Sequence, residues 1–295
     1  MIKKMKNIIQ LLRPHQWVKN FFIAAPMFFA FMITLHNVLL VVAGIAIFSL
    51  CASAVYVFND IYDVAEDRQH PEKRKRPIAS GQISIKFAWL LAFVLFSVSI
   101  TVAYFFNINF FIILIVYVSI NILYTMVLKH IAIVDITIIA IGFVLRLFAG
   151  ASIINVQTSM WIVLVTFWLA LFLALAKRRD EYLHYINGKK VRKNIDGYNL
   201  EMINAGMVLL ATITVVAYIM YSVTPAVMER MGSDKLYLTS IFVVVGILRY
   251  MQLTFVYEKS GNPTDVLLTD RFLQMVIALW LLSFYVIHVL PKISL

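Results

Sequence analysis

The sequence predicts an all-α, polytopic membrane protein, and three observations support that fold class. Hydrophobic residues make up 62% of the 295-residue chain and charged residues only 14%, well below the roughly 25% usual in soluble domains. Apolar runs of nearly the length that a helix needs to cross a bilayer recur along the whole chain. The charged residues gather between those runs. We therefore expect residues 1–295 to form a single integral membrane domain.

The charge balance narrows the classes of partner. A net charge of +11 would suggest nucleic acid in a soluble protein. Here the positive charge lies in the loops of one side, so membrane orientation and anionic substrates explain it better, and no nucleic acid is expected. The single Cys51 allows no intramolecular disulfide. The first apolar run lacks the features of a cleavable signal peptide.

The elements begin with a basic segment, residues 1–19. Its apolar residues Met5, Ile8, Ile9 and Leu12 share one helical face, which predicts a helix lying in the membrane interface. Residues 13–20 read RPHQWVKN, and Lys19 with Asn20 stands at the cytoplasmic end of the first expected span. From the residues alone, a snorkelling anchor and a phosphate contact are equally good interpretations of Lys19.

Nine membrane spans follow from the apolar runs. We place them near residues 20–36, 38–58, 85–106, 109–128, 131–153, 159–176, 200–222, 237–257 and 271–290. The long charged loops, 59–84, 177–199 and 258–270, all follow even-numbered spans. On this map 21 of the 26 Lys and Arg residues face one side and three face the other. This asymmetry predicts a cytoplasmic N-terminus and an outside C-terminus.

The most informative stretch of the chain runs from Asn59 to Gly81. Asn59, Asp60, Asp63 and Asp67 form the pattern N-D-x-x-D-x-x-x-D, whose spacing puts the side chains on one face of a helix. Carboxylates so placed repel one another, and a divalent cation reverses that effect. Mg²⁺ prefers oxygen ligands and is usually bound through one or two carboxylates plus substrate phosphates. The four residues are therefore candidate metal ligands, and the three aspartates are candidate catalytic residues.

A basic run follows this acidic face directly: Arg68, Lys73, Arg74, Lys75 and Arg76. Such cations can hold phosphate oxygens, and acid followed by base in one loop is what a metal–diphosphate site needs. The alternative is a solvated loop whose charges only set topology. We favour the site, because Asp contributes little to topology.

Two ionisable residues fall inside the fifth expected span. Asp135 lies near its cytoplasmic end, where the helix dipole favours an acid. Arg146 lies deeper, and intramembrane ionisable residues suggest function by default. Arg146 could pair with a carboxylate structurally or line a cavity for a lipid phosphate, and the sequence leaves both interpretations open.

The stretch N-D-x-x-D-x-x-x-D-R-x-H-P-x-K-R-x-R-P-I-A-S-G resembles the first aspartate-rich motif of the UbiA superfamily of intramembrane prenyltransferases. Its tail, with LRPHQWVKN at 12–20, is similar to the polyprenyl-phosphate phosphoribosyltransferase branch. The resemblance implies a UbiA-like helical bundle with its active site on the cytoplasmic side. It also favours a phosphate contact for Lys19, with Asn20, Asn59, Arg68, Lys73, Arg76 and Arg146 as further substrate-binding candidates.

The second charged loop departs from the superfamily pattern. Most members have a second motif, D-x-x-x-D, there, whereas this chain has Lys177-Arg178-Arg179-Asp180-Glu181. One acidic and one basic patch fit a donor that carries a diphosphate and a separate 5-phosphate. We assign Lys177, Arg178 and Glu181 to substrate binding, because Arg donates two parallel hydrogen bonds to phosphate.

The resemblance implies Mg²⁺-dependent transfer of 5-phosphoribose from 5-phosphoribosyl 1-diphosphate to a polyprenyl phosphate, in the inner membrane of a bacterium or archaeon. One rival is an aromatic prenyltransferase of the same superfamily that uses a prenyl diphosphate donor. Another is a non-catalytic polyprenyl-lipid carrier, which needs no clustered carboxylates. The lipid chain length and the oligomeric state, a homo-oligomer included, stay open.

Overall fold

The computed structural model describes residues 2–188, 193–259 and 261–293, and within them every regular element is a helix. This confirms the all-α prediction. The chain forms two compact units, residues 1–157 and 158–295, and each is described by itself. The expectation of one integral domain stays a prediction.

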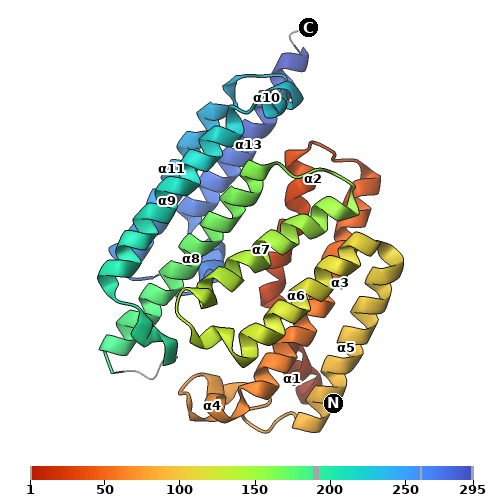
Figure 1. The fold of residues 1–295 in the computed structure, drawn as a ribbon, viewed down its shortest axis with the longest axis vertical. Helices are drawn as coiled ribbons and strands as arrows, with labels where there is room; N and C mark the ends of the chain where they lie inside the picture. The colour runs from red at the N-terminus through yellow and green to blue at the C-terminus, as the bar shows by residue number, and fades with distance from the viewer. Residues whose placement is uncertain (1, 189–192, 260, 294–295) are drawn as a thin grey trace. The chain divides into compact units, whose positions relative to one another are not determined.

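The first unit is a bundle built around its longest helix, α3 (Figure 1). α3 packs against α1, η1, α5 and α6, and α7 packs against α6 and η1. Its elements are α1 (Ile2–Leu12), η1 (Pro14–Ala24), α2 (Ala25–Phe29), α3 (Leu35–Tyr62), α4 (Val64–Gln69), η2 (Lys73–Lys75), α5 (Ile85–Phe106), α6 (Ile108–Met126), η3 (Leu128–His130) and α7 (Val134–Ile153).

The first expected span, 20–36, is not one continuous helix. The chain runs through the 3₁₀ segment η1 and the short helix α2, and it then turns at Phe31 before α3 begins. Prolines explain the break, because Pro14 and Pro26 lack the amide hydrogen that a helix interior requires. Arg13, between α1 and η1, adopts a left-handed backbone with φ of 52°. The segment therefore differs from a standard transmembrane helix.

Side-chain caps fix where three of the long helices begin. Thr34 accepts a hydrogen bond from the Asn37 amide at the start of α3. Ser84 caps α5 and Asn107 caps α6 in the same way. These caps satisfy amide groups that have no partner within the helix. Consequently α5 and α6 begin within a residue of the predicted spans.

Two apolar clusters hold the first unit together. The larger one joins α3, α6 and α7, with Phe48, Phe110 and Leu114 fully buried. The smaller one contains Leu11 of α1 and Ile78 of the loop before α5. The second cluster anchors both α1 and that loop next to the end of α3.

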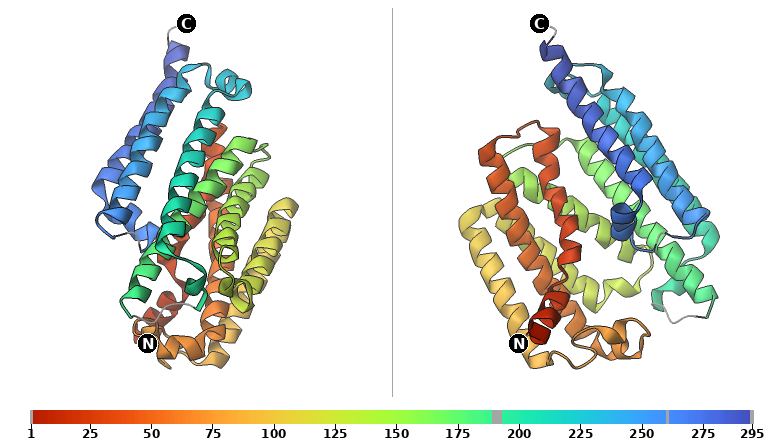
Figure 2. Two further views of the ribbon diagram at one scale, coloured as in Figure 1. Left: turned by 60° about the vertical axis from the view of Figure 1, so that its left-hand side comes forward. Right: turned by 180° about the vertical axis from the view of Figure 1, so that it is seen from behind.

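The second unit consists of two pairs of long helices (Figure 2). α8 packs against α9, and α11 packs against α13 and α9. Its elements are α8 (Met160–Ile186), η4 (Lys193–Gly197), α9 (Leu200–Ser222), α10 (Pro225–Met231), η5 (Lys235–Thr239), α11 (Ser240–Phe255), α12 (Pro263–Thr269) and α13 (Arg271–Ile293).

Eight helices of the described residues are long and apolar enough to cross a bilayer. They correspond to the second to ninth expected spans. The α8 helix continues ten residues past the predicted end at 176, so its charged residues lie on a helix and not in a loop. Lys189, Lys190 and Arg192 of the expected loop lie outside the described residues.

Candidate functional site

Asp60 is the centre of the charged cluster in the first unit. It lies in the last turn of α3 and is 2% exposed. Its Oδ1 accepts hydrogen bonds from Arg13 Nη2 at 2.5 Å and from Arg76 Nη1 at 3.0 Å. The Arg13 guanidinium also lies over the Tyr56 ring, 5.4 Å from its centroid. Two cations therefore compensate one buried carboxylate, which would otherwise be costly to bury.

Arg76 links Asp60 to the next carboxylate of the motif. The same Nη1 atom donates to Asp67 Oδ2 at 2.6 Å, and Asp67 is also buried. One nitrogen thus lies between two carboxylates. The position between Asp60 and Asp67 is already occupied by positive charge.

Asp63 interrupts the helix that the motif was expected to form. It is the residue between α3 and α4, with φ of −88° and ψ of 5°, so the four motif residues do not share one continuous helix. Its Oδ1 pairs with Nζ of Lys129. That Nζ lies 5.3 Å from the centroid of the Tyr62 ring. Asn59 accepts a hydrogen bond from the Thr125 hydroxyl.

The charge cluster, as we call this set, therefore contains three carboxylates and three cations from distant parts of the first unit. Its members are Asp60, Asp63, Asp67, Arg13, Arg76 and Lys129. In the part of the chain that the structure describes, no three acidic, His or Cys side chains form a metal-binding group by themselves. The carboxylates repel one another, and the sequence suggested that a metal ion relieves this repulsion. In the structure, Lys and Arg side chains of the same chain balance it.

The loop after α4 positions Arg76. His70 Nδ1 accepts hydrogen bonds from the amides of Glu72 and Lys73, at 3.2 and 3.3 Å. Partial burial, followed by the charge of Lys73, lowers the pKa of His70, which suits a ring that accepts these bonds. Arg68 donates from Nε to the Ala79 carbonyl at 3.3 Å. Arg68 therefore stabilises the conformation of this loop. The phosphate-binding roles of Arg68 and of Lys73, which lies in η2, stay predictions.

Arg146 occupies a separate buried network. Its Nε donates to Asn20 Oδ1 at 2.8 Å and its Nη2 to the Tyr117 hydroxyl at 3.3 Å. The guanidinium lies 5.0 Å from the ring centroid of Phe48. Asn20 in turn donates to Ser49 at 2.8 Å. No carboxylate forms an ion pair with Arg146 among the residues that the structure describes, so of the two interpretations left open by the sequence, the pairing with a carboxylate is not seen there.

In the second unit, the predicted basic patch lies on α8. Arg178 is 1% exposed, and its Nη1 pairs with Glu181 Oε2 one turn later. Lys177 precedes it on the same helix. Pairs at this spacing support a helix, which explains why the helix continues beyond the apolar run. The binding roles of these three residues stay predictions.

Sequence reasoning did not identify two members of the charge cluster, Arg13 and Lys129. Arg13 lies in the RPHQWVKN stretch and Lys129 is one of the 21 basic residues on the expected inner side, but neither residue lies in a spacing pattern that indicates a site residue. The position of each residue in the sequence could have indicated its role. Each stands at the end of an apolar run, on the same expected side of the membrane as the acidic motif. Asp135 lies in the first turn of α7, as the dipole argument predicted.

Known proteins share both the sequence pattern and the fold. The decaprenyl-phosphate phosphoribosyltransferase of Mycolicibacterium smegmatis is 31% identical, covering 93% of this chain and 90% of its own. The protein of the same name from Mycobacterium tuberculosis is 32% identical, covering 93% of this chain and 92% of its own. A UbiA homolog from Archaeoglobus fulgidus, solved with DMAPP and Mg²⁺, has a TM-score of 0.70 at 22% identity, covering 96% of this chain and 99% of that one.

The family match spans most of the chain. The model described as the UbiA prenyltransferase family matches residues 20–276, a range that includes the whole acidic motif and the loop after it. The relatives from the two mycobacterial species extend the similarity to nine-tenths of the sequence. The chain therefore belongs to the UbiA prenyltransferase family.

Proposed function

We propose that the protein transfers 5-phosphoribose from 5-phosphoribosyl 1-diphosphate to a membrane polyprenyl phosphate. A phosphate oxygen of the lipid attacks the anomeric carbon, and the bond from that carbon to the diphosphate breaks. The products are polyprenyl-phosphoryl 5-phosphoribose and diphosphate. No general base is required, because a phosphate monoester is already anionic near neutral pH.

The observation that carries this proposal is the charge cluster. Asp60 and Asp67 share one Arg76 nitrogen, and Arg13 and Lys129 complete the balance. A diphosphate that approached would compete for these cations, since charge-assisted hydrogen bonds to phosphate are among the strongest in proteins. Arg13, Arg76 and Lys129 would then hold phosphate oxygens, and the carboxylates would become available to a metal.

The side-chain oxygen atoms of the acidic motif are suitable ligands for Mg²⁺. Carboxylate and amide oxygens of Asn59, Asp60, Asp63 and Asp67 are the ligand types that it prefers, and one or two carboxylates suffice when substrate phosphates complete the coordination. The contact of Arg76 Nη1 with both Asp60 and Asp67 is consistent with a cation position between them. When bound, Mg²⁺ would neutralise the charge that develops on the leaving diphosphate.

Six further residues are part of the proposal. Lys177, Arg178 and Glu181 are proposed to hold the 5-phosphate, and Lys19, Asn20 and Arg146 to contact substrate. The soluble donor is proposed to enter from the cytoplasm, where the Lys and Arg distribution puts the charged segments. The relatives' name, decaprenyl-phosphate phosphoribosyltransferase, supports this substrate pair.

A second candidate function is prenyl transfer from a prenyl diphosphate to an aromatic acceptor. It is favoured by the likeness to the Archaeoglobus fulgidus structure, which contains DMAPP and Mg²⁺. It is disfavoured by the second charged segment, where Arg178 pairs with Glu181 and no D-x-x-x-D motif occurs. A passive lipid carrier would not need the charge cluster.

The test is a transfer assay with the purified protein in detergent or nanodiscs. The protein receives radiolabelled 5-phosphoribosyl 1-diphosphate, polyprenyl phosphate and Mg²⁺, and the label that enters an organic extract is counted. We expect extraction to require both the lipid phosphate and the metal, with one diphosphate released for each labelled lipid formed.

The controls separate the candidates. Prenyl diphosphate with 4-hydroxybenzoate replaces the substrate pair in a parallel reaction, and Asp63→Asn protein serves as the inactive reference. If only the prenyl reaction yields product, the phosphoribosyl proposal is wrong and the second candidate is supported. If neither reaction yields product while the lipid phosphate still binds, the carrier interpretation is favoured.

A further inference from the structure

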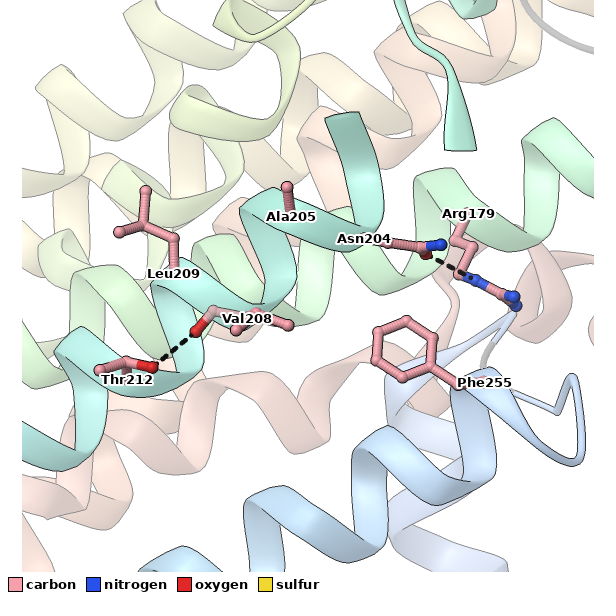
Figure 3. Close-up of a pocket in the computed structure, with 7 residues that line it drawn as sticks. All are labelled: Arg179, Asn204, Ala205, Val208, Leu209, Thr212 and Phe255. Atoms are coloured by element: carbon pink, nitrogen blue, oxygen red, sulfur yellow. Dashed lines mark hydrogen bonds between the residues drawn. The ribbon is translucent and has the colours of Figure 1, made fainter. Parts of the chain in front are cut away.

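The second unit contains an open groove that none of the proposed catalytic or substrate-binding residues line. It has a volume of about 870 Å³ and lies along α9, with α8 and α11 contributing one residue each (Figure 3). The lining residues are Arg179, Asn204, Ala205, Val208, Leu209, Thr212 and Phe255.

One long side of the groove is apolar. The lining residues of α9 recur at helical spacing from Asn204 to Thr212, a distance of roughly 12 Å along the helix axis at 1.5 Å per residue. Val208 is 50% and Leu209 59% exposed. The Thr212 hydroxyl donates to the Val208 carbonyl at 2.9 Å, so it presents little polarity. In a bilayer this wall would contact a hydrocarbon chain.

The opposite end is polar and built around Arg179. The side chain is only 8% exposed. Its Nε donates to Asn204 Oδ1 at 3.1 Å and its Nη1 to the Thr254 carbonyl at 2.7 Å. Its guanidinium lies 5.2 Å from the Phe255 ring centroid. Arg179 is thus held in place at the head of the groove and does not extend freely toward water.

Arg179 is a buried cation bonded only to neutral groups. Among the residues that the structure describes, no carboxylate is within ion-pair distance of it, and neither its Nη2 nor Asn204 Nδ2 forms a hydrogen bond. A buried charge without a counter-charge is costly, and in membrane proteins such residues mark ligand sites. The two remaining donors, Nη2 and Nδ2, are suited to an anion.

We propose that this groove binds an anionic phospholipid, with the phosphodiester at Arg179 and Asn204 and one acyl chain along Val208 and Leu209. The charge argues for this occupant. A phosphodiester carries one negative charge, which the single guanidinium balances, whereas a phosphate monoester such as polyprenyl phosphate approaches two and would need a second cation. Arg179 is near the end of α8 and Asn204 near the start of α9, so the polar end lies toward the membrane surface. This inference is independent of the transfer reaction.

The test measures lipid binding to the full-length protein by native mass spectrometry. Wild type is titrated with phosphatidylglycerol, with phosphatidylcholine and with polyprenyl phosphate. We expect phosphatidylglycerol to bind more tightly than the zwitterionic lipid, and Arg179→Gln to weaken that binding by about 10-fold, the order expected for one hydrogen bond to a charged group. Arg271→Gln removes an exposed charge outside the groove, and we expect it to leave the binding of phosphatidylglycerol unchanged.

A second pair of variants keeps the test decisive if Arg179→Gln does not fold. Leu209→Trp fills the apolar wall while leaving Arg179 in place, and Val216→Trp adds the same bulk two turns further along α9, at a site that is 52% exposed. Only Leu209→Trp is expected to reduce phosphatidylglycerol binding. The proposal is overturned if both tryptophan variants bind alike, if phosphatidylglycerol has no advantage, or if polyprenyl phosphate displaces it from the groove.

Discussion

At the scale of single residues, the effect of a substitution in the charge cluster is best argued at Asp60. It is almost fully buried, and both Arg13 and Arg76 donate to the same oxygen. Removal of this carboxylate would leave two partly buried guanidinium groups without their shared counter-charge.

We expect Asp60→Ala to abolish transfer and to lower the free energy of unfolding by about 3 kcal/mol. The loss of activity follows from the loss of a proposed metal ligand. The loss of stability follows from breaking a buried ion pair. Organic extraction of label measures the first effect, and denaturant unfolding in detergent measures the second.

Two variants serve as references for that change. Asp63→Asn keeps the side-chain volume but removes the charge that pairs with the buried Lys129. We expect it to abolish transfer and to lower the free energy of unfolding by less than Asp60→Ala does, because Asp63 itself is less buried than Asp60. Glu72→Gln removes an exposed pair with Lys75, which contributes less than about 1 kcal/mol, and is expected to change neither property. Normal transfer by Asp63→Asn at saturating Mg²⁺ would contradict the metal assignment.

At the scale of elements, the contact between α7 and η1 depends on Gly150. A Cβ atom at this position would collide with the carbonyl group of Ile23, which is backbone and cannot rotate away. We expect Gly150→Ala to destabilise the first unit by about 1–3 kcal/mol, as overpacking does. Gly246→Ala is the matched control, because its Cβ would meet Val276 at an ordinary 3.7 Å, and it is expected to be neutral or slightly stabilising. Thermal unfolding of both variants measures the difference, and equal stabilities would contradict the close contact.

The start of α13 depends on a pair that responds to pH. Asp270 accepts hydrogen bonds from Arg249, the shorter at 2.7 Å, and from the Leu273 amide at 2.8 Å. The bond from Arg249 lowers the pKa of Asp270 below its usual 3.8. The stabilisation of the folded state by ionised Asp270 is therefore fully present above pH 3.8, and it is lost as the pH falls through the lower pKa that Asp270 has in the folded protein. We expect Asp270→Asn to be less stable than wild type at pH 7 and the gap to shrink on acidification toward pH 3, as followed by unfolding. A gap that stays constant would contradict the assignment.

At the scale of the whole molecule, the sequence predicted the elements far better than the contacts between them. The chain is an integral membrane protein, and its long apolar runs coincide with α5, α6 and α9 almost residue for residue. Four of the six members of the charge cluster were predicted. Arg13 and Lys129 were not, because they are 47 and 66 positions from their partners, and periodicity carries no information about such pairings. The end of α8 was missed because an apolar run can stop before its helix does.

The number of times that the chain crosses the membrane depends on the segment that contains η1 and α2. At about 2.0 Å per residue for a 3₁₀ helix and 1.5 Å for an α-helix, its 16 residues from Pro14 to Phe29 extend roughly 30 Å if they are collinear, the thickness of the hydrocarbon core. In the first unit, α1 and α2 lie at opposite ends of α3 (Figure 1). The broken segment is therefore long enough to replace a regular helix.

We accordingly expect nine crossings, with residues 69–80 on the cytoplasmic side and the C-terminus outside. On the map of expected spans, 21 Lys and Arg residues fall on the side of the acidic motif and three on the other, and this predicted asymmetry is the electrostatic reason. Reporter tags that are active on only one side of the membrane test this arrangement when fused at each terminus and inserted at residue 72. Tags at the two termini are expected to report opposite sides, and the tag at residue 72 the same side as the N-terminus. If both termini report the cytoplasm, the segment from Pro14 to Phe29 enters the membrane without crossing it, and the chain crosses only through the eight long helices.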